Sequence, residues 1–134
     1  MGFNLCTLDT NVLLRVILND NEDHNIKARS LINTPGMYFT ILDQAVLEMN
    51  YILSGTLHYP RSVIVDLITS TLAEPRLDYN EKLFKKVFDL YLARPKLSLT
   101  DCYMAFKTEE IGHTPLYTFD EKLVKQFPSA KLIP

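Results

Sequence analysis

Four acidic residues stand at points of the sequence where a carboxylate could do chemistry. Asp9 and Asp120 each follow a short apolar run, and a segment of helical period begins after each of them. Asp101 likewise begins a helical segment after an apolar stretch, and Glu48 lies in a segment that is apolar on most sides. Because an unpaired carboxylate is costly to bury, we expect Glu48 to find a cation or hydrogen-bond partners.

Each acid also has an ordinary structural interpretation. Asp9 could cap a helix, and Asp101 could be a capping or first-turn acid that the helix dipole favours. Glu48 could lie on the exposed edge of its helix. If the four carboxylates instead converge, they repel one another unless protons or cations intervene. Oxygen ligands suit Mg²⁺ or Mn²⁺, which clamp a phosphodiester and activate a water. The sequence thus predicts Asp9, Glu48, Asp101 and Asp120 as catalytic metal ligands.

The elements that must position these acids follow from the hydropathy pattern, in which short apolar runs alternate with segments of helical period. Strands are predicted over residues 4–9, 37–41, 76–79, 116–119 and 131–133. Helices are predicted over residues 12–18, 23–32, 80–93, 101–110 and 121–126, from Asp43 towards Gly55, and between Pro60 and Pro75. The strand at 4–9 is expected to be buried on both faces, and Thr100 is expected to cap the helix that follows it.

This alternation predicts an α/β fold of three layers, α/β/α, around a mostly parallel central sheet of roughly five strands. Functional sites in open α/β sheets lie outside the carboxyl ends of the strands, where Asp9 and Asp120 are expected. The length of 134 residues and the lack of an internal linker predict a single domain over residues 1–134.

The bulk composition is that of a globular protein. No segment approaches the roughly 18 apolar residues that span a membrane. Only two cysteines occur, without metal-ligand spacing, so we expect unpaired thiols and a cytoplasmic location. The net charge is −2, but leaving the four acids aside, 14 basic residues face 12 acidic ones. A nucleic-acid substrate is therefore not excluded.

The ordered set of motifs resembles the PIN-domain ribonucleases, and in particular the VapC-type toxins of toxin–antitoxin pairs. The resemblance covers essentially the whole chain. It is carried by residues 8–14 (LDTNVLL), by Glu48 with the apolar residues 51–53, by residues 99–105 (LTDCYMA) and by residues 118–120 (TFD).

This resemblance implies a Mg²⁺- or Mn²⁺-dependent endoribonuclease in which a metal-activated water attacks an RNA phosphodiester in line. Asp9 and Asp101 are the first choices for direct ligands, Glu48 and Asp120 complete the shell, and Asn11 and Thr118 are supporting polar residues. By the same resemblance the protein is a toxin that forms a homodimer, and a small antitoxin silences it by placing a C-terminal segment in the acidic groove.

Two other functions compete with this interpretation. A non-catalytic PIN-like module would keep the fold and bind RNA or protein without turnover. A phosphatase of the haloacid dehalogenase type also places an aspartate after its first strand, but it needs a second acid two residues later, where Asn11 stands. Separately, Lys82, Lys85 and Lys86 could contact phosphates or simply form the solvated face of their helix.

Overall fold

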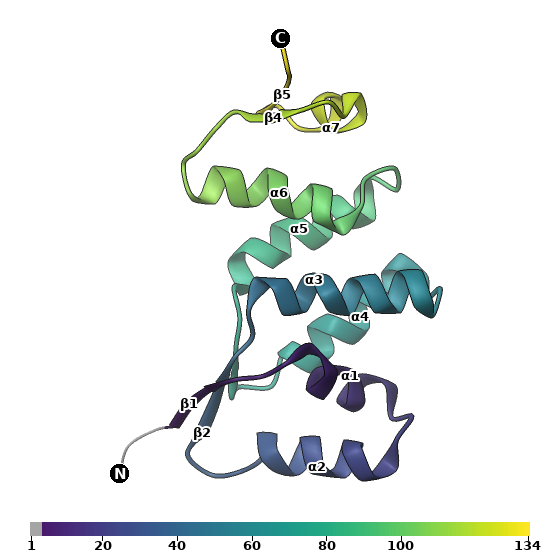
Figure 1. Ribbon diagram of the computed structural model, residues 1–134, viewed down its shortest axis with the longest axis vertical. Helices are drawn as coiled ribbons and strands as arrows, with labels where there is room; N and C mark the ends of the chain where they lie inside the picture. The colour runs from purple at the N-terminus through teal and green to yellow at the C-terminus, as the bar shows by residue number, and fades with distance from the viewer. Residues whose placement is uncertain (1–3) are drawn as a thin grey trace. The chain divides into compact units, whose positions relative to one another are not determined.

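The computed structural model describes residues 4–134, and the chain divides into two compact units, Met1–Asn80 and Glu81–Pro134, called the N-terminal and C-terminal units below (Figure 1). The N-terminal unit contains, in order, β1 (Asn4–Thr7), α1 (Thr10–Leu18), α2 (Glu22–Ile32), β2 (Met37–Thr40), α3 (Asp43–Tyr51), the π-helical turn η1 (Ile52–Thr56), α4 (Arg61–Leu72) and β3 (Leu77–Asp78). The C-terminal unit contains α5 (Glu81–Ala93), α6 (Leu99–Glu110), β4 (Leu116–Thr118), α7 (Glu121–Gln126) and β5 (Ala130–Leu132).

The sheet of the N-terminal unit is parallel and has the strand order β1-β2-β3. Thr7 pairs with Thr40, and Thr40 pairs with Asp78, so the carboxyl ends of all three strands lie at one edge. Parallel neighbours need crossover connections. The pair α1 and α2 connects β1 to β2, and α3, η1 and α4 connect β2 to β3. As a result, α1 and α3 both begin at the carboxyl edge of the sheet.

The helices of the N-terminal unit pack through apolar faces. α1 contacts α2, α3 and α4. The side chains of Leu13, Val46, Met49, Ile64 and Ile68, from α1, α3 and α4, are fully buried. Burial of each such side chain stabilises the fold by roughly 1.5–3 kcal/mol. This packing fixes the first turn of α1 against α3.

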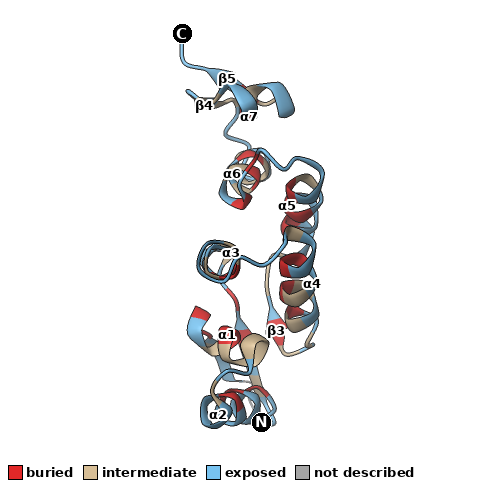
Figure 2. Ribbon diagram, turned by 90° about the vertical axis from the view of Figure 1, so that its right-hand side faces the viewer, coloured by how far each residue is buried: buried red, intermediate tan, exposed pale blue. Residues whose placement is uncertain are grey.

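The helix α5 shows the amphipathic pattern that its sequence predicts. Its buried positions lie along one side of the helix, opposite its exposed ones (Figure 2). That buried side packs on α6, where the ring of Phe84 stacks on Tyr103 with centroids 5.7 Å apart. Sequence periodicity alone therefore defines which face of α5 is left to solvent.

The remaining elements of the C-terminal unit form a small α/β layer. The strands β4 and β5 are parallel, and α7 packs against both of them. The ring of Phe127, which follows α7, meets Phe106 of α6 edge to face at 5.1 Å. Gly112 adopts a φ of +75° just after α6, a conformation that favours glycine and ends the helix.

The observed fold confirms the α/β class and the parallel strands, and it contains a helix at each position where the sequence predicted one. The described strands form two parallel sheets, β1-β2-β3 and β4-β5, where the sequence predicted one sheet of about five. The expectation that β1 is buried on both faces was wrong. Leu5 is 80% exposed and the pattern of β1 is mostly exposed, so the faces of this strand are not covered as a central strand of a three-layer fold would be. The predicted cap was also wrong, since Ser98 and not Thr100 caps α6.

Neither Cys6 nor Cys102 forms a disulfide, as predicted; Cys102 is buried and Cys6 is half-buried. Across residues 4–134, no helix combines the length and the hydropathy that a membrane span would need.

Candidate functional site

Two of the four predicted acids lie around one cavity in the N-terminal unit. Asp9 and Glu48 line a cavity of about 350 Å³ at the carboxyl end of β1 and the first turns of α3. The other lining residues are Thr7, Leu8, Thr10, Leu42, Gln44 and Ala45. The packing of α1 on α3 brings these acids together from positions 39 residues apart in the sequence.

The carboxylate of Glu48 is held from both sides. The hydroxyl of Thr10 donates to its Oε2 at 2.6 Å, and the amide Nε2 of Gln44 donates to its Oε1 at 3.1 Å. The first distance is in the short range of hydrogen bonds to an ionised acceptor. Glu48 is exposed, which corrects the premise that it is buried, but it does have the hydrogen-bond partners that the sequence predicted. The carboxylate is therefore fixed in orientation.

Sequence reasoning did not single out Thr10 or Gln44. Gln44 lies four residues before Glu48 on α3, a spacing that places two side chains on the same helix face, so it could have been found. Thr10 could not, because its contact with Glu48 depends on how α1 packs against α3. Thr10 is only 5% exposed, so its hydroxyl reaches Glu48 from a packed position.

Asp9 occupies the capping position of α1 but does not cap it. Its backbone is extended, as at a helix start, yet its side chain makes no capping hydrogen bond. The first turn is closed instead by the backbone, with the Val12 N–H donating to the Asp9 carbonyl at 3.1 Å. The exposed carboxylate of Asp9 is thus left available to a ligand in the cavity, as a functional acid requires.

Asp101 and Asp120, in the C-terminal unit, both take part in helix capping, Asp101 as the partner of Ser98 and Asp120 as the cap of α7. The Ser98 N–H donates to Oδ2 of Asp101 at 3.0 Å, while Ser98 Oγ accepts from the Asp101 N–H at 3.1 Å. Oδ1 of Asp120 accepts from the N–H groups of Lys122 and Leu123 at 2.9 and 3.3 Å. Capping occupies one oxygen of each carboxylate, and the second oxygen carries no hydrogen bond within residues 4–134.

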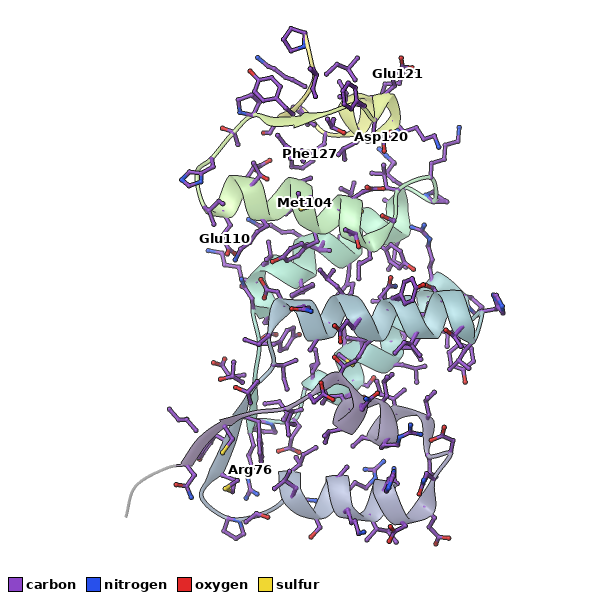
Figure 3. The ribbon with its side chains drawn as sticks, in the orientation of Figure 1. Arg76, Met104, Glu110, Asp120, Glu121 and Phe127 are labelled. Carbon is purple, nitrogen blue, oxygen red and sulfur yellow. The ribbon has the colours of Figure 1, made fainter. Side chains whose placement is uncertain are left out.

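The two predicted supporting residues differ in their surroundings. Thr118 accepts the Asp120 N–H on its Oγ1 at 2.9 Å, so it orders the turn that presents Asp120. Figure 3 shows Asp120 and Glu121 together at the start of α7. Asn11 is exposed and lines a different cavity, with Arg15, among others, and not the one that holds Asp9. The structure therefore does not place Asn11 with the acids.

The oxygen donors in the cavity that holds Asp9 and Glu48 are of the kind that bind a hard divalent cation. Among residues 4–134, no group of three or more acidic, histidine or cysteine side chains is gathered as a metal cluster. Asp9 and Glu48 supply carboxylate oxygens only, the donors that Mg²⁺ and Mn²⁺ prefer. Each ionised carboxylate has about four lone-pair sites, so the bonds from Thr10 and Gln44 still leave Glu48 able to bind a cation.

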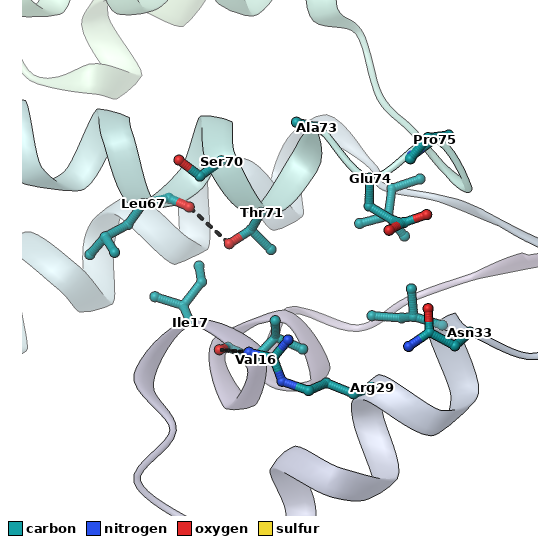
Figure 4. A pocket seen from close by; sticks show the side chains of 12 residues that line it. Val16, Ile17, Arg29, Asn33, Leu67, Ser70, Thr71, Ala73, Glu74 and Pro75 are labelled. Carbon is teal, nitrogen blue, oxygen red and sulfur yellow. Dashed lines mark hydrogen bonds between the residues drawn. The ribbon is translucent and has the colours of Figure 1, made fainter.

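A larger cavity of the N-terminal unit, about 550 Å³, is lined by residues of α1, α2, α4 and β3 (Figure 4). None of the four predicted acids lines it. Two of its polar side chains are bound locally: Arg29 donates to the Val16 carbonyl at 3.4 Å, and Thr71 donates to the Leu67 carbonyl at 2.8 Å. The cavity that holds Asp9 and Glu48 is therefore the better candidate for chemistry.

Comparison with known proteins gives matches among the solved structures. No protein-family model matches the chain, and no curated protein matches it. The chain is similar to one in the crystal structure of VapBC2 from Rickettsia felis bound to a DNA fragment from their promoter. The identity is 17%, and the match covers 96% of this chain and 97% of the other, with a TM-score of 0.40. At this identity and TM-score, the likeness establishes neither a common fold nor a common activity.

Proposed function

We propose that this protein is a Mg²⁺- or Mn²⁺-dependent endoribonuclease of the PIN-domain type, with Asp9, Glu48, Asp101 and Asp120 as its metal-binding acids. The observation that carries the proposal is the cavity at the end of β1. There, Glu48 is oriented by two hydrogen bonds while Asp9, at a capping position, leaves its carboxylate free. Two residues that served only as caps or surface charges would not need this arrangement.

The roles of the residues follow from their contacts. A divalent ion held by the acids would supply positive charge at a phosphodiester and lower the pKa of a water. Thr10 and Gln44 hold the Glu48 carboxylate in a single orientation, the function that outer hydrogen-bond partners serve at metal sites. Thr118 keeps the turn before α7 in place, and with it the position of Asp120.

The proposed quartet needs one sheet edge that collects acids from both units. We propose that the two parallel sheets join into a single central sheet of five strands with helices on both faces. The open edge of β1 supports this joining, because within residues 4–134 β1 pairs with β2 on one side and with no strand on the other. Unpaired strand edges of this kind are normally covered or paired in native proteins.

The toxin role is part of the same proposal and rests on the order of the four motifs. It places the protein in the cytoplasm as a homodimer, with RNA as substrate and a small antitoxin as partner. Expression in a bacterial host would test it: growth should stop with the wild-type chain and continue with Asp9→Asn. Continued growth with both would remove the support for a toxin.

Cleavage of RNA tests the enzyme. Purified wild type, Asp9→Asn and Asp101→Asn are incubated with a structured RNA in Mg²⁺, in Mn²⁺ and in EDTA. We expect cleavage by the wild type with either metal, none in EDTA, and none by the two variants, which keep the wild-type circular dichroism. Equal cleavage by all three proteins would refute the site, and binding of RNA without cleavage by the wild type would favour the non-catalytic module.

A further inference from the structure

The exposed side of α5 carries three lysines. Lys82, Lys85 and Lys86 are all exposed, and their spacing of three and four residues puts them on one face with Cβ atoms about 5–6 Å apart. Within residues 4–134, none of the three side chains makes an ion pair or a hydrogen bond. By contrast, Arg15, Lys27 and Lys107 are each paired with an acid. Asp89, three residues after Lys86 and four after Lys85, lies on the same face and is acidic.

The charge of the chain is divided unevenly between the two units. Residues 1–80 contain nine acidic and five basic residues, a net charge of −4. Residues 81–134 contain seven acidic and nine basic residues, a net charge of +2. The C-terminal unit is therefore basic although the whole chain has a net charge of −2. The three lysines of α5 are a third of the basic residues in this unit.

We propose that this lysine face, Lys82, Lys85 and Lys86, binds the phosphate backbone of the RNA substrate. The proposal rests on the proposed function, which supplies RNA as the ligand, and on charge complementarity between unpaired cations and a polyanion. A protein partner fits less well, because lysine is depleted in the cores of protein interfaces, where aromatic residues and arginine prevail. Lysines on flexible stems suit phosphates, which they bind as point charges without reading the base sequence.

The proposal predicts a specific salt dependence. A fluorescein-labelled, unstructured 20-nucleotide RNA is titrated with the full chain in EDTA, so that binding is measured without cleavage. Neutralising the face in Lys82→Ala/Lys85→Ala/Lys86→Ala removes up to three phosphate contacts. The slope of log K against log salt should then become shallower by up to about 2, at roughly 0.7 per contact for a single strand. The affinity at low salt should fall at least about tenfold. Because these positions are exposed on a helix and alanine favours helices, the variant should keep its fold.

A matched control variant distinguishes the effect of the lysine face on RNA binding from the effect of net charge alone. Lys122→Ala/Lys125→Ala/Lys131→Ala removes the same charge from exposed positions of α7 and β5 in the same unit. It should bind RNA with nearly the wild-type slope. An equal loss in both triple variants, wild-type binding by the α5 variant, or no RNA binding by the wild type would each overturn the proposal. Displacement of the RNA by polyglutamate as effective as by unlabelled RNA would also overturn it, in favour of an acidic protein ligand.

The outcomes also separate this proposal from the enzyme itself. If the wild type binds RNA through α5 but does not cleave it with Mg²⁺ or Mn²⁺, the proposed ribonuclease function is refuted and the proposed RNA-binding role of the lysine face is supported. If cleavage requires Asp9 and Asp101 but the α5 variant binds and cleaves like the wild type, the function stands and the face fails.

Discussion

Glu48 accepts a hydrogen bond on each of its carboxylate oxygens, whereas Asp9, across the same cavity, accepts none from the residues that the structure describes. The Glu48 carboxylate is therefore fixed in orientation, and the Asp9 carboxylate is open to a ligand. The residue types and positions of both acids were predictable from the sequence. The hydrogen bond from Thr10 to Glu48 was not, because it depends on the packing of two helices that are distant in the sequence.

Removing the Thr10 hydroxyl tests whether it positions Glu48. Thr10→Val keeps the shape of the side chain but loses the donor at 2.6 Å from Glu48. We expect the rate of RNA cleavage to fall by roughly 10–100-fold, the usual effect of losing an outer partner at a metal site. Thr10→Ser, which restores a hydroxyl, should recover most of the rate. If valine and serine variants cleave alike, the hydroxyl has no positioning role.

At the scale of elements, the sequence predicts where the helices lie better than it predicts which residues cap them. Hydrophobic periodicity predicted all the helices, because the apolar residues of a helix such as α5 recur at helical spacing within one short segment. The choice of cap was harder. Ser98 caps α6 because its side chain and that of Asp101 bond each other's backbone N–H groups, a reciprocal arrangement that a single residue does not reveal. Asp9 shows the converse, a favoured capping residue at a helix start that leaves its helix uncapped.

Capping has a measurable consequence for stability. Asp120→Ala removes an acceptor for two N–H groups of α7 and should cost about 1 kcal/mol of unfolding free energy. Asp9→Ala, in metal-free buffer, should leave the stability unchanged or raise it, because it relieves repulsion with Glu48 without losing a cap. Urea unfolding of the two variants beside the wild type checks both. A loss for Asp9→Ala as large as for Asp120→Ala would mean that Asp9 caps α1 in solution.

At the scale of the whole molecule, the sequence predicted strands and their parallel direction but not how the sheets are divided. Parallel pairing between strands depends on contacts between residues far apart in the chain, and the short strands β3, β4 and β5 carry little pattern to specify a neighbour. Within the N-terminal unit, the structure brings two of the four predicted acids, Asp9 and Glu48, to one cavity. The joined five-strand sheet remains a proposal that an experiment can decide.

Amide hydrogen exchange tests that joining. The N–H groups of Asn4 and Leu8 donate to Gly36 and Thr40, towards β2. By the alternation of a parallel ladder, the N–H groups of Leu5 and Thr7 face the open edge of β1. A joined sheet would bond these two groups, so their exchange should be as slow as that of the groups facing β2. Rapid exchange at Leu5 and Thr7 alone would show that β1 stays an edge strand.

The central proposal is that Asp9, Glu48, Asp101 and Asp120 bind one set of divalent ions, and Mn²⁺ binding tests it without any substrate. Electron paramagnetic resonance follows free Mn²⁺ during titration of wild type, Asp9→Asn, Asp101→Asn and Asp66→Asn, the last an exposed acid of α4 outside the cavity. We predict that the wild type and Asp66→Asn bind Mn²⁺ equally and that the other two variants both lose this binding. Loss in Asp9→Asn together with wild-type binding in Asp101→Asn would contradict a shared site.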